Sequence, residues 1–330
     1  MLVFVAIITG GEILGNRKLS LEGQIQQMKA QHIGFSIVNE AEAIEYLSNH
    51  TYYFRLKYYA ENYEKTKVPG AGTHYADLEF AYLKELSLLD LYYRRIMFNI
   101  VQDVEHYAKI KLLKALAKNK KEDGYNIVEE YMARHKWFDK ELSKHQSHYA
   151  KGLIEKYKGN FAVWNIIEVQ TFAQFIDLYE LYFKIYQQKH IPARLLDVVK
   201  SLRNSIAHNN CVMFNLHKAA MTEETDEAIA IAIEAGMDEQ QTRELMQVPF
   251  VRDLTITLHV FDNIVSSKEE KAWQLTELNL LVNNRFNRHM DYFAKNSVVL
   301  PVLKYCQKLV KVYYDSASQA WNNSGEPVNY

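Results

Sequence analysis

Residues 202–216 read LRNSIAHNNCVMFNL, and the rest of the chain can be placed around the RNSIAH core at residues 203–208. Arginine is a permanently charged, forked donor that suits a phosphate group, and histidine exchanges a proton near neutral pH. Asn204 and His208 are four residues apart, so on a helix the amide can lie over the imidazole and fix its tautomer. The segment predicts a helix that presents phosphate-handling groups.

One copy of this helix makes a poor site, because Arg203 and His208 point about 140° apart around the helix axis. A two-fold interface pairs the same patch of each subunit, so two copies would surround one phosphodiester with both arginines and both histidines. We therefore expect a homodimer. Asn209-Asn210 is a helix-stop signal that leaves His208 in the last turn, where the helix dipole favours a protonated ring and hence a general acid.

An arginine and a histidine at this spacing also occur by chance, and a helix-end histidine bonded to carbonyl oxygens is the plainer interpretation. Three further segments support the motif: YYFRLKYY at 52–59, EHYAK at 105–109 and FAVWNIIEVQTFAQF at 161–175. Together with RNSIAHNN they resemble the Abi-like abortive-infection proteins of bacteria, most closely the AbiF-type branch. The resemblance covers residues 18–216 in separated pieces. Ala162 and Ala173 stand where that family has proline and glycine, which touches packing and not the proposed chemistry.

The Abi-like proteins belong to the HEPN superfamily of helical, metal-independent ribonucleases, so the resemblance implies an all-α, HEPN-like helical bundle with additional N- and C-terminal helices. It also implies an anti-phage endoribonuclease in which the ribose 2′-OH attacks the adjacent phosphate. His208 would then exchange protons with the attacking or leaving oxygen, Arg203 would stabilise the charge on phosphorus, and Asn204 would orient the histidine or the phosphate. The implied partners are RNA and a second copy of the chain, with no metal and no small-molecule cofactor.

Two other functions stay open. HEPN proteins also include members that bind RNA without cutting it, here as a protein complexed with a small structured noncoding RNA. A plain helical protein-interaction module is the third possibility, and it predicts that no nucleic acid co-purifies. Whether an antitoxin exists cannot be read from the sequence.

The EHYAK segment resembles the polar position that HEPN proteins carry opposite the Arg-His motif. Glu105 would hold Arg203 or His208 in place, and Lys109 would add charge for RNA, although an ordinary solvated ion pair at this spacing is equally compatible. Further lysines recur at spacings of three and four along the same predicted helix. They form either a track for an RNA backbone or a solvated face, and they are Lys111, Lys114, Lys118 and Lys121.

Arg55 lies among aromatic residues and could stack on bases or hold a phosphate. The preferred interpretation is structural: Tyr52, Phe54 and Tyr58 pack the core while Arg55 ties two helices together, because buried aromatics with polar tips are common in helical domains. Trp164 and Phe172 are expected to be core anchors. Arg285 and His289 imitate the main motif, but their polar neighbours favour a helix surface.

Composition sets further bounds. Hydrophobic residues make up 48% of the 330, and only 5 Pro and 12 Gly are present, which favours a folded, helix-rich chain. The formal net charge of −1 rules out a global basic field, so any RNA contact must be local. Two cysteines, Cys211 and Cys306, fit a reduced cytoplasmic protein. His145 and His148 have metal-ligand spacing but lack a convincing third ligand, which favours a basic surface.

The apolar run LVFVAII at residues 2–8 is too short to span a bilayer, so we expect no membrane contact. It is either a short strand or an upstream extension of the reading frame. Helices are predicted at 19–31, 40–49, 75–121 and 126–158, with a Pro-Gly loop at 69–72 and a helix that begins at Pro192. The expected organisation is an N-terminal extension at 1–17, the HEPN-like Abi domain at 18–216, an acidic helical insertion at 217–249, C-terminal helices packed on the core at 250–315 and a loose tail at 316–330.

Overall fold

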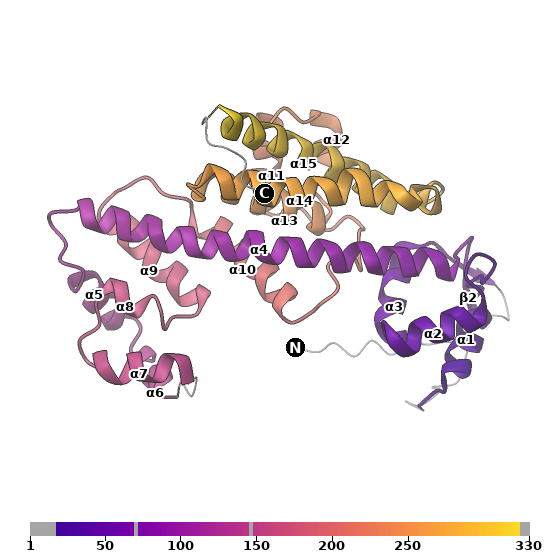
Figure 1. Ribbon diagram of the computed structural model, residues 1–330, viewed down its shortest axis with the longest axis horizontal. Helices are drawn as coiled ribbons and strands as arrows, with labels where there is room; N and C mark the ends of the chain where they lie inside the picture. The colour runs from indigo at the N-terminus through magenta and orange to yellow at the C-terminus, as the bar shows by residue number, and fades with distance from the viewer. Residues whose placement is uncertain (1–17, 69–71, 145–147, 324–330) are drawn as a thin grey trace.

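The longest element of the computed structural model is helix α4 (Phe80–Lys118), whose 39 residues run the length of the molecule (Figure 1). The structure describes residues 18–68, 72–144 and 148–323. Apolar side chains recur at spacings of three and four along α4 and are buried on several of its sides, so the other elements can pack around it. They include Leu83, Leu86, Leu89, Tyr93, Met97, Ile100, Val104, Ala108 and Leu112.

Short helices cover one end of α4, namely α1 (Leu21–Ala30), α2 (Glu40–Asn49), α3 (Tyr53–Tyr59) and the 3-10 turn η1 (Ala60–Asn62). Helix α1 begins at Ser20, whose hydroxyl accepts a hydrogen bond from the N–H of Gly23 at 3.1 Å. The Asn39 and Glu42 side chains form a capping box at the start of α2. The two helices predicted for this region are confirmed.

A two-stranded antiparallel sheet follows, formed by β1 (Lys65–Val68) and β2 (Gly72–Tyr75). The sequence predicted only the loop between them, because four-residue strands as polar as KTKV and GTHY carry no hydrophobic alternation. Helix α4 accordingly begins at Phe80, five residues later than predicted. Apart from this hairpin and one isolated bridge, the regular secondary structure of the described residues is helical, and the predicted all-α class is confirmed.

The other end of α4 carries α5 (Asn126–Arg134), α6 (Phe138–Lys144), α7 (His148–Tyr157), α8 (Val163–Ile166) and α9 (Phe172–Ile185). Three helices replace the single one predicted for 126–158, and the predicted basic surface around His145 falls partly outside the described residues. Phe172 is buried as expected, but Trp164 is 47% exposed. The Trp164 indole lies directly against Gly124, whose φ of 91° a side chain would strain, so the tryptophan covers a turn instead of anchoring the core.

Helix α10 (Ala193–Ala207) packs against α4, α9 and α13 (Pro249–Ile264). The acidic segment forms a hairpin of α11 (Glu223–Glu234) and α12 (Glu239–Leu245), as predicted, and turns at Gly236. The Arg194 guanidinium ties α11 to the first turn of α10 through the Glu227 carboxylate, with Nε to Oε2 at 2.6 Å. This contact lies at the opposite end of α10 from His208.

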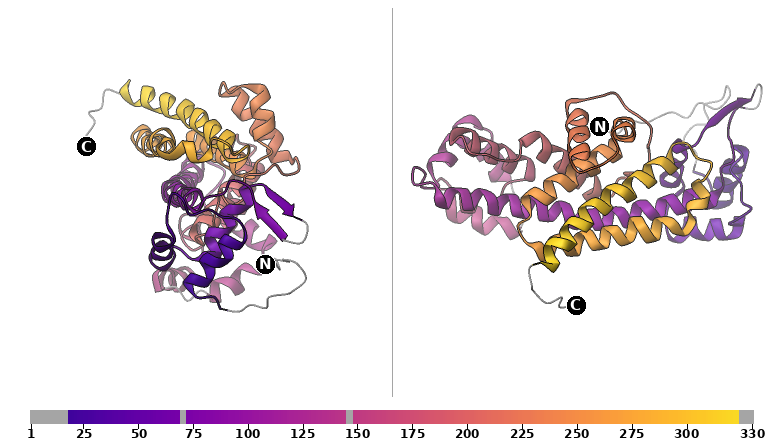
Figure 2. Two further views of the ribbon diagram at one scale, coloured as in Figure 1. Left: turned by 90° about the vertical axis from the view of Figure 1, so that its right-hand side faces the viewer. Right: turned by 90° about the horizontal axis from the view of Figure 1, so that it is seen from above.

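The C-terminal helices lie along one face of α4 (Figures 1 and 2). They comprise α13, α14 (Lys268–Leu280), the π-helical turn η2 (Leu281–Arg285), the 3-10 segment η3 (Phe286–Phe293) and α15 (Val299–Asn322). The predicted loose tail is wrong for residues 316–322, because α15 continues and still buries Ala317. None of the helices in the described ranges has the length and apolarity needed to cross a bilayer. The predicted segments 1–17 and 324–330 lie outside the described residues.

Candidate functional site

The motif helix α10 ends as the sequence predicts. Its buried stripe includes Leu202 and Ile206, while Asn204 and His208 are exposed. His208 is the C-cap, and Asn209 adopts a left-handed φ of 56°. Two backbone bonds close the helix: Asn209 N–H donates to Ile206 O at 2.8 Å and Asn210 N–H donates to Ser205 O at 2.9 Å, the pattern of a Schellman motif.

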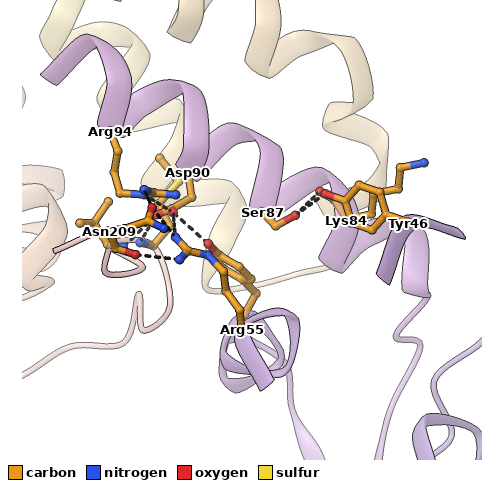
Figure 3. A network of polar contacts seen from close by, with 10 residues as sticks. Tyr46, Arg55, Lys84, Ser87, Asp90, Arg94 and Asn209 are labelled. Carbon is orange, nitrogen blue, oxygen red and sulfur yellow. Dashed lines mark hydrogen bonds and ion pairs between the residues drawn. The ribbon is translucent and has the colours of Figure 1, made fainter. Parts of the chain in front are cut away.

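Asp90 of α4 fixes the loop that follows the motif. Its Oδ1 accepts the N–H groups of Val212 at 2.8 Å and Met213 at 2.9 Å. Its Oδ2 accepts the Tyr59 hydroxyl and Arg94 Nε, each at 2.8 Å. The carboxylate is fully buried, and a buried charge is tolerated only with such a set of donors. The chain leaving α10 is therefore held rigidly against α4 (Figure 3).

Two arginines clamp Asn209. Arg55 Nη1 of α3 donates to the Asn209 carbonyl oxygen at 2.7 Å, and Arg94 Nη1 of α4 donates to Asn209 Oδ1 at 2.5 Å (Figure 3). Arg55 Nη2 also lies 3.9 Å from Asp90 Oδ2, and the Arg55 side chain is only 11% exposed. Within one chain, Arg55 joins α3 to the residue after His208, and little of its guanidinium is left to face a ligand.

The aromatic residues of α3 lie differently from the prediction. Tyr52 and Phe54 are 58% and 59% exposed and Tyr58 is 39% exposed, so their predicted burial in the core is wrong. The reason is the orientation of α3: Arg55 and Tyr59 are four residues apart and both contact Asp90, which turns Phe54 and Tyr58 outward.

His208, Tyr52 and Tyr58 line one groove of about 840 Å³. Phe54 packs edge-on against Tyr58 with ring centroids 4.8 Å apart, and Tyr58 packs edge-on against Phe214 at 5.9 Å. The remaining lining comes from α3, α10, the loop after α10 and α13, and includes Arg55, Ser205, Phe214, Phe250 and Asp253. Burial raises the pKa of the Asp253 carboxyl, which Arg252 partly offsets.

Arg203 faces away from this groove. Its Nη2 lies 3.5 Å from Glu105 Oε2 of α4, and Glu105 Oε1 lies 3.7 Å from Lys109 Nζ. Arg203 Nη1 donates to Asn204 Oδ1 at 3.2 Å, so the amide bonds the arginine and not the histidine. In the part of the chain that the structure describes, no side chain hydrogen-bonds the His208 ring, and Arg203 Nε is buried without a partner. The fold thus brings Glu105 to Arg203 but separates Arg203 from His208.

The lysine stripe is shorter than predicted. Lys114 and Lys118 are exposed, whereas Lys111 is half-buried and its pKa is lowered by burial and by the charge of Lys189. Helix α4 ends at Lys118, so Lys121 lies in the following turn and not on the stripe. Its predicted place on the helix is wrong because Asn119, with an extended ψ of 99°, ends the helix first.

The imitation motif at Arg285 is not a plain helix surface. Arg285 forms a bidentate salt bridge with the nearly buried Glu85 carboxylate of α4, with Nη2 to Oε2 at 2.9 Å. Its guanidinium also lies over the Tyr92 ring. His289 has a non-helical φ of −133°, so the two residues share no regular helix. Polar neighbours concealed this ion pair, because its partner lies 200 positions away in the sequence.

Asp90 and Asn209 were missed as positioning residues. A signal was available: Asp90 is the lone charge in the run LSLLDLYY, and a carboxylate among apolar helix residues requires buried partners. Across residues 18–68, 72–144 and 148–323, no three His, Cys, Asp or Glu side chains gather closely enough to hold one metal ion.

A comparison with protein families matches the part of the chain that contains α4 and α10. The model of the family described as Abi-like protein matches residues 45–215, which include the aromatic segment, Asp90, Glu105 and the motif. Searches of curated proteins and of solved structures gave no match. Because the family model spans slightly more than half of the 330 residues, the chain belongs to the Abi-like proteins, the family of abortive infection.

Proposed function

We propose that this abortive-infection protein is an anti-phage, metal-independent endoribonuclease of the HEPN superfamily, in its AbiF-type branch, acting in the cytoplasm as a homodimer. The observation that carries the proposal is the His208 ring. The ring is exposed and lines a groove. The chain that directly follows His208 is held in place by Asp90, Arg55 and Arg94. A proton-transfer group needs this combination of access and fixed geometry.

The reaction is attack of a ribose 2′-OH on the adjacent phosphate, with release of the 5′-oxygen of the next nucleotide. His208 takes or gives the proton at one of these oxygens, and Arg203 stabilises the added negative charge on the phosphate. Asn204 holds the guanidinium through the bond that it already makes.

The separation of Arg203 and His208 on α10 supports the proposal of a second copy. In one chain the guanidinium faces Glu105, whereas the imidazole faces the aromatic groove. An exposed strip of α10, made by Ser201, Asn204 and His208, is available to pair with its counterpart in a two-fold interface. Such pairing would set Arg203 of one subunit against His208 of the other, and the complete site would lie at the seam.

The aromatic residues of the groove at His208 indicate whether the bound RNA is single-stranded or duplex. Exposed aromatic faces stack unpaired bases of any sequence, and they cannot reach bases inside a duplex. Tyr52, Tyr58 and Phe214 border the groove that contains His208. The substrate is therefore a single-stranded or looped region, bound by stacking more than by charge.

One observation favours a second candidate, a non-catalytic RNA-binding protein complexed with a small structured noncoding RNA. Arg203 is already engaged by Glu105 within one chain, so the guanidinium is not free in the groove. In that case the aromatic residues and Lys114 and Lys118 would carry the affinity, and His208 would contribute nothing.

The test is incubation of the purified protein with single-stranded RNA in EDTA. Cleavage is expected to persist in the chelator and to fall by at least about 100-fold in His208→Ala. His50→Ala is the matched control, since His50 is also an exposed C-cap, on α2, with its ring stacked on Tyr46. Cleavage that requires a divalent metal, or that survives in His208→Ala, refutes the nuclease. RNA binding without cleavage by the wild-type protein supports the second candidate.

A further inference from the structure

A second cavity of about 700 Å³ lies where the β1–β2 hairpin meets the segment 291–298. None of the residues that line it also lines the groove at His208. Its walls carry the rings of Tyr63, Tyr82 and Tyr292, with Tyr82 and Tyr292 centroids 5.2 Å apart. Four carboxylates also belong to the lining: Glu64, Asp77, Glu79 and Asp291.

Within the described residues, these carboxylates form no ion pair. Among the ion pairs of the described residues, none includes any of the four, and Lys295 is the sole lysine or arginine in the cavity lining that the structure describes. Of the four, only the Glu79 carboxylate accepts hydrogen bonds from another described residue, namely the Ser36 N–H at 3.0 Å and the Ser36 hydroxyl at 2.8 Å. The pKa of the Tyr82 hydroxyl is raised by burial and further by the charges of Glu79, Asp291 and Asp77, which line the same cavity.

Tyr63 adds an independent sign of an absent ligand. It is 7% exposed, and its buried hydroxyl has no hydrogen-bond partner within the described part of the chain. The pKa of the Tyr63 hydroxyl is raised mainly by burial and further by Tyr82, which lines the same cavity. Leaving such a group unbonded costs about 1–3 kcal/mol, which a ligand that bonds it would recover.

The arrangement of the charges indicates the class of ligand. No three of the carboxylates converge closely enough to share one metal ion. Negative charge that is spread over a cavity of this size, between aromatic faces, instead suits an elongated organic cation with several amino groups. Ammonium groups form short charge-assisted bonds to carboxylates and bind the faces of tyrosine rings. The volume also lies within the range of ordinary small-molecule sites.

We propose that this cavity binds a linear polyamine. The ligand contacts Asp77 beside β2, the ring and hydroxyl of Tyr63, and Asp291 of η3. It therefore bridges the N-terminal hairpin and the C-terminal helices. Because it binds the folded chain and not the unfolded one, it raises the stability of the protein. This inference does not rest on the ribonuclease and is measured without RNA.

The experiment is titration of the full-length protein with spermidine by calorimetry, with the melting temperature as a second readout. Asp77→Asn/Asp291→Asn is expected to weaken binding about tenfold or more, because each lost charge removes a charge-assisted bond. Asparagine tolerates the left-handed φ of 50° at position 77, so the fold is preserved. Tyr63→Phe is expected to weaken binding about three- to tenfold without destabilising the free protein, since the hydroxyl is unbonded there.

The matched control is Glu234→Gln/Glu244→Gln on the acidic hairpin α11–α12, which removes the same charge from exposed positions and leaves binding within twofold. Mg²⁺ at equal ionic strength should neither compete with spermidine nor raise the melting temperature as much. The inference is overturned if spermidine does not bind, if the control weakens binding as much as the cavity variant does, or if Mg²⁺ displaces the polyamine.

Discussion

Helix α4 offers a glutamate to each of two Arg-His segments, and the two pairings differ. Glu85 is nearly buried and takes two bonds from Arg285, whereas Glu105 lies 3.5 Å from Arg203 and is shared with Lys109 at 3.7 Å. His289 stacks on Tyr292 with centroids 4.6 Å apart, while the His208 ring is exposed. The same residue types serve architecture in one place and remain accessible in the other, so geometry and not residue identity marks the site.

Activity should separate the two arginines most strongly. Arg203→Ala is expected to lower the cleavage rate by about 100- to 1,000-fold, the usual loss when one donor to a developing charge is removed. Arg285→Ala should leave the rate per folded molecule within about twofold, because its guanidinium is spent on Glu85. Initial rates on a labelled RNA, normalised to folded protein, decide this. Equal losses in both variants would erase the distinction between the segments.

Stability should rank them in the opposite order. Arg285→Ala leaves the Glu85 carboxylate uncompensated and is expected to lower the free energy of unfolding by about 3 kcal/mol, the lower end for a buried pair because Arg285 keeps some exposure. Arg203→Ala should cost under about 1 kcal/mol, since its contacts are long and partly exposed. Urea denaturation measures both. The comparison breaks down if Arg203→Ala proves the more destabilising change.

Asn209 tests how the accessible segment is held. Asn209→Gly keeps the left-handed conformation but loses the amide that Arg94 and Arg55 contact, and Asn209→Ala loses the amide and also pays for a β-carbon at positive φ. Alanine should therefore be less stable than glycine by about 1 kcal/mol. Both variants should slow cleavage. His289→Ala, at a residue with negative φ, should neither add backbone strain nor slow cleavage. A stable and fully active Asn209→Ala would show that the clamp is dispensable.

The smallest effect is expected from the lysines at the far end of α4. If Lys114 and Lys118 neutralise phosphates, Lys114→Gln/Lys118→Gln should reduce the slope of log affinity against log salt by about 1.4, at 0.7 per single-strand phosphate. Lys268→Gln/Lys304→Gln, at exposed positions on α14 and α15, is the matched control. Parallel salt titrations of RNA binding compare the two. Unchanged slopes would confine RNA recognition to the groove at His208.

Local signals allowed much of the fold to be predicted. Ser20 and the residues after Asn39 set the starts of α1 and α2, and Asn209 sets the end of α10, because caps and stops depend on neighbours within a few positions. The pairing of Glu105 with Arg203 was suggested by family resemblance, since spacing alone gave no reason to choose it over a solvated ion pair.

Long-range packing explains the failures. The outward turn of Phe54 and Tyr58 follows from the contact of Arg55 and Tyr59 with Asp90, 31 positions beyond Tyr59. Trp164 is drawn to Gly124, and Arg285 to Glu85, over similar or larger separations. A helical wheel shows which residues share a face but not which face meets the rest of the chain. The groove beside His208 could therefore not be derived from the sequence.

Asp90 accepts hydrogen bonds from the amide N–H groups of Val212 and Met213, so its contact with this loop involves only the main chain. This contact therefore sets no requirement on those side chains, although Met213 is itself fully buried in the core. The length of the loop is more tightly constrained, because one inserted or deleted residue would withdraw both amides and leave Asp90 Oδ1 without its donors inside the fold. In evolutionary terms, the segment after the motif should resist insertions and deletions throughout and tolerate substitutions at its exposed positions.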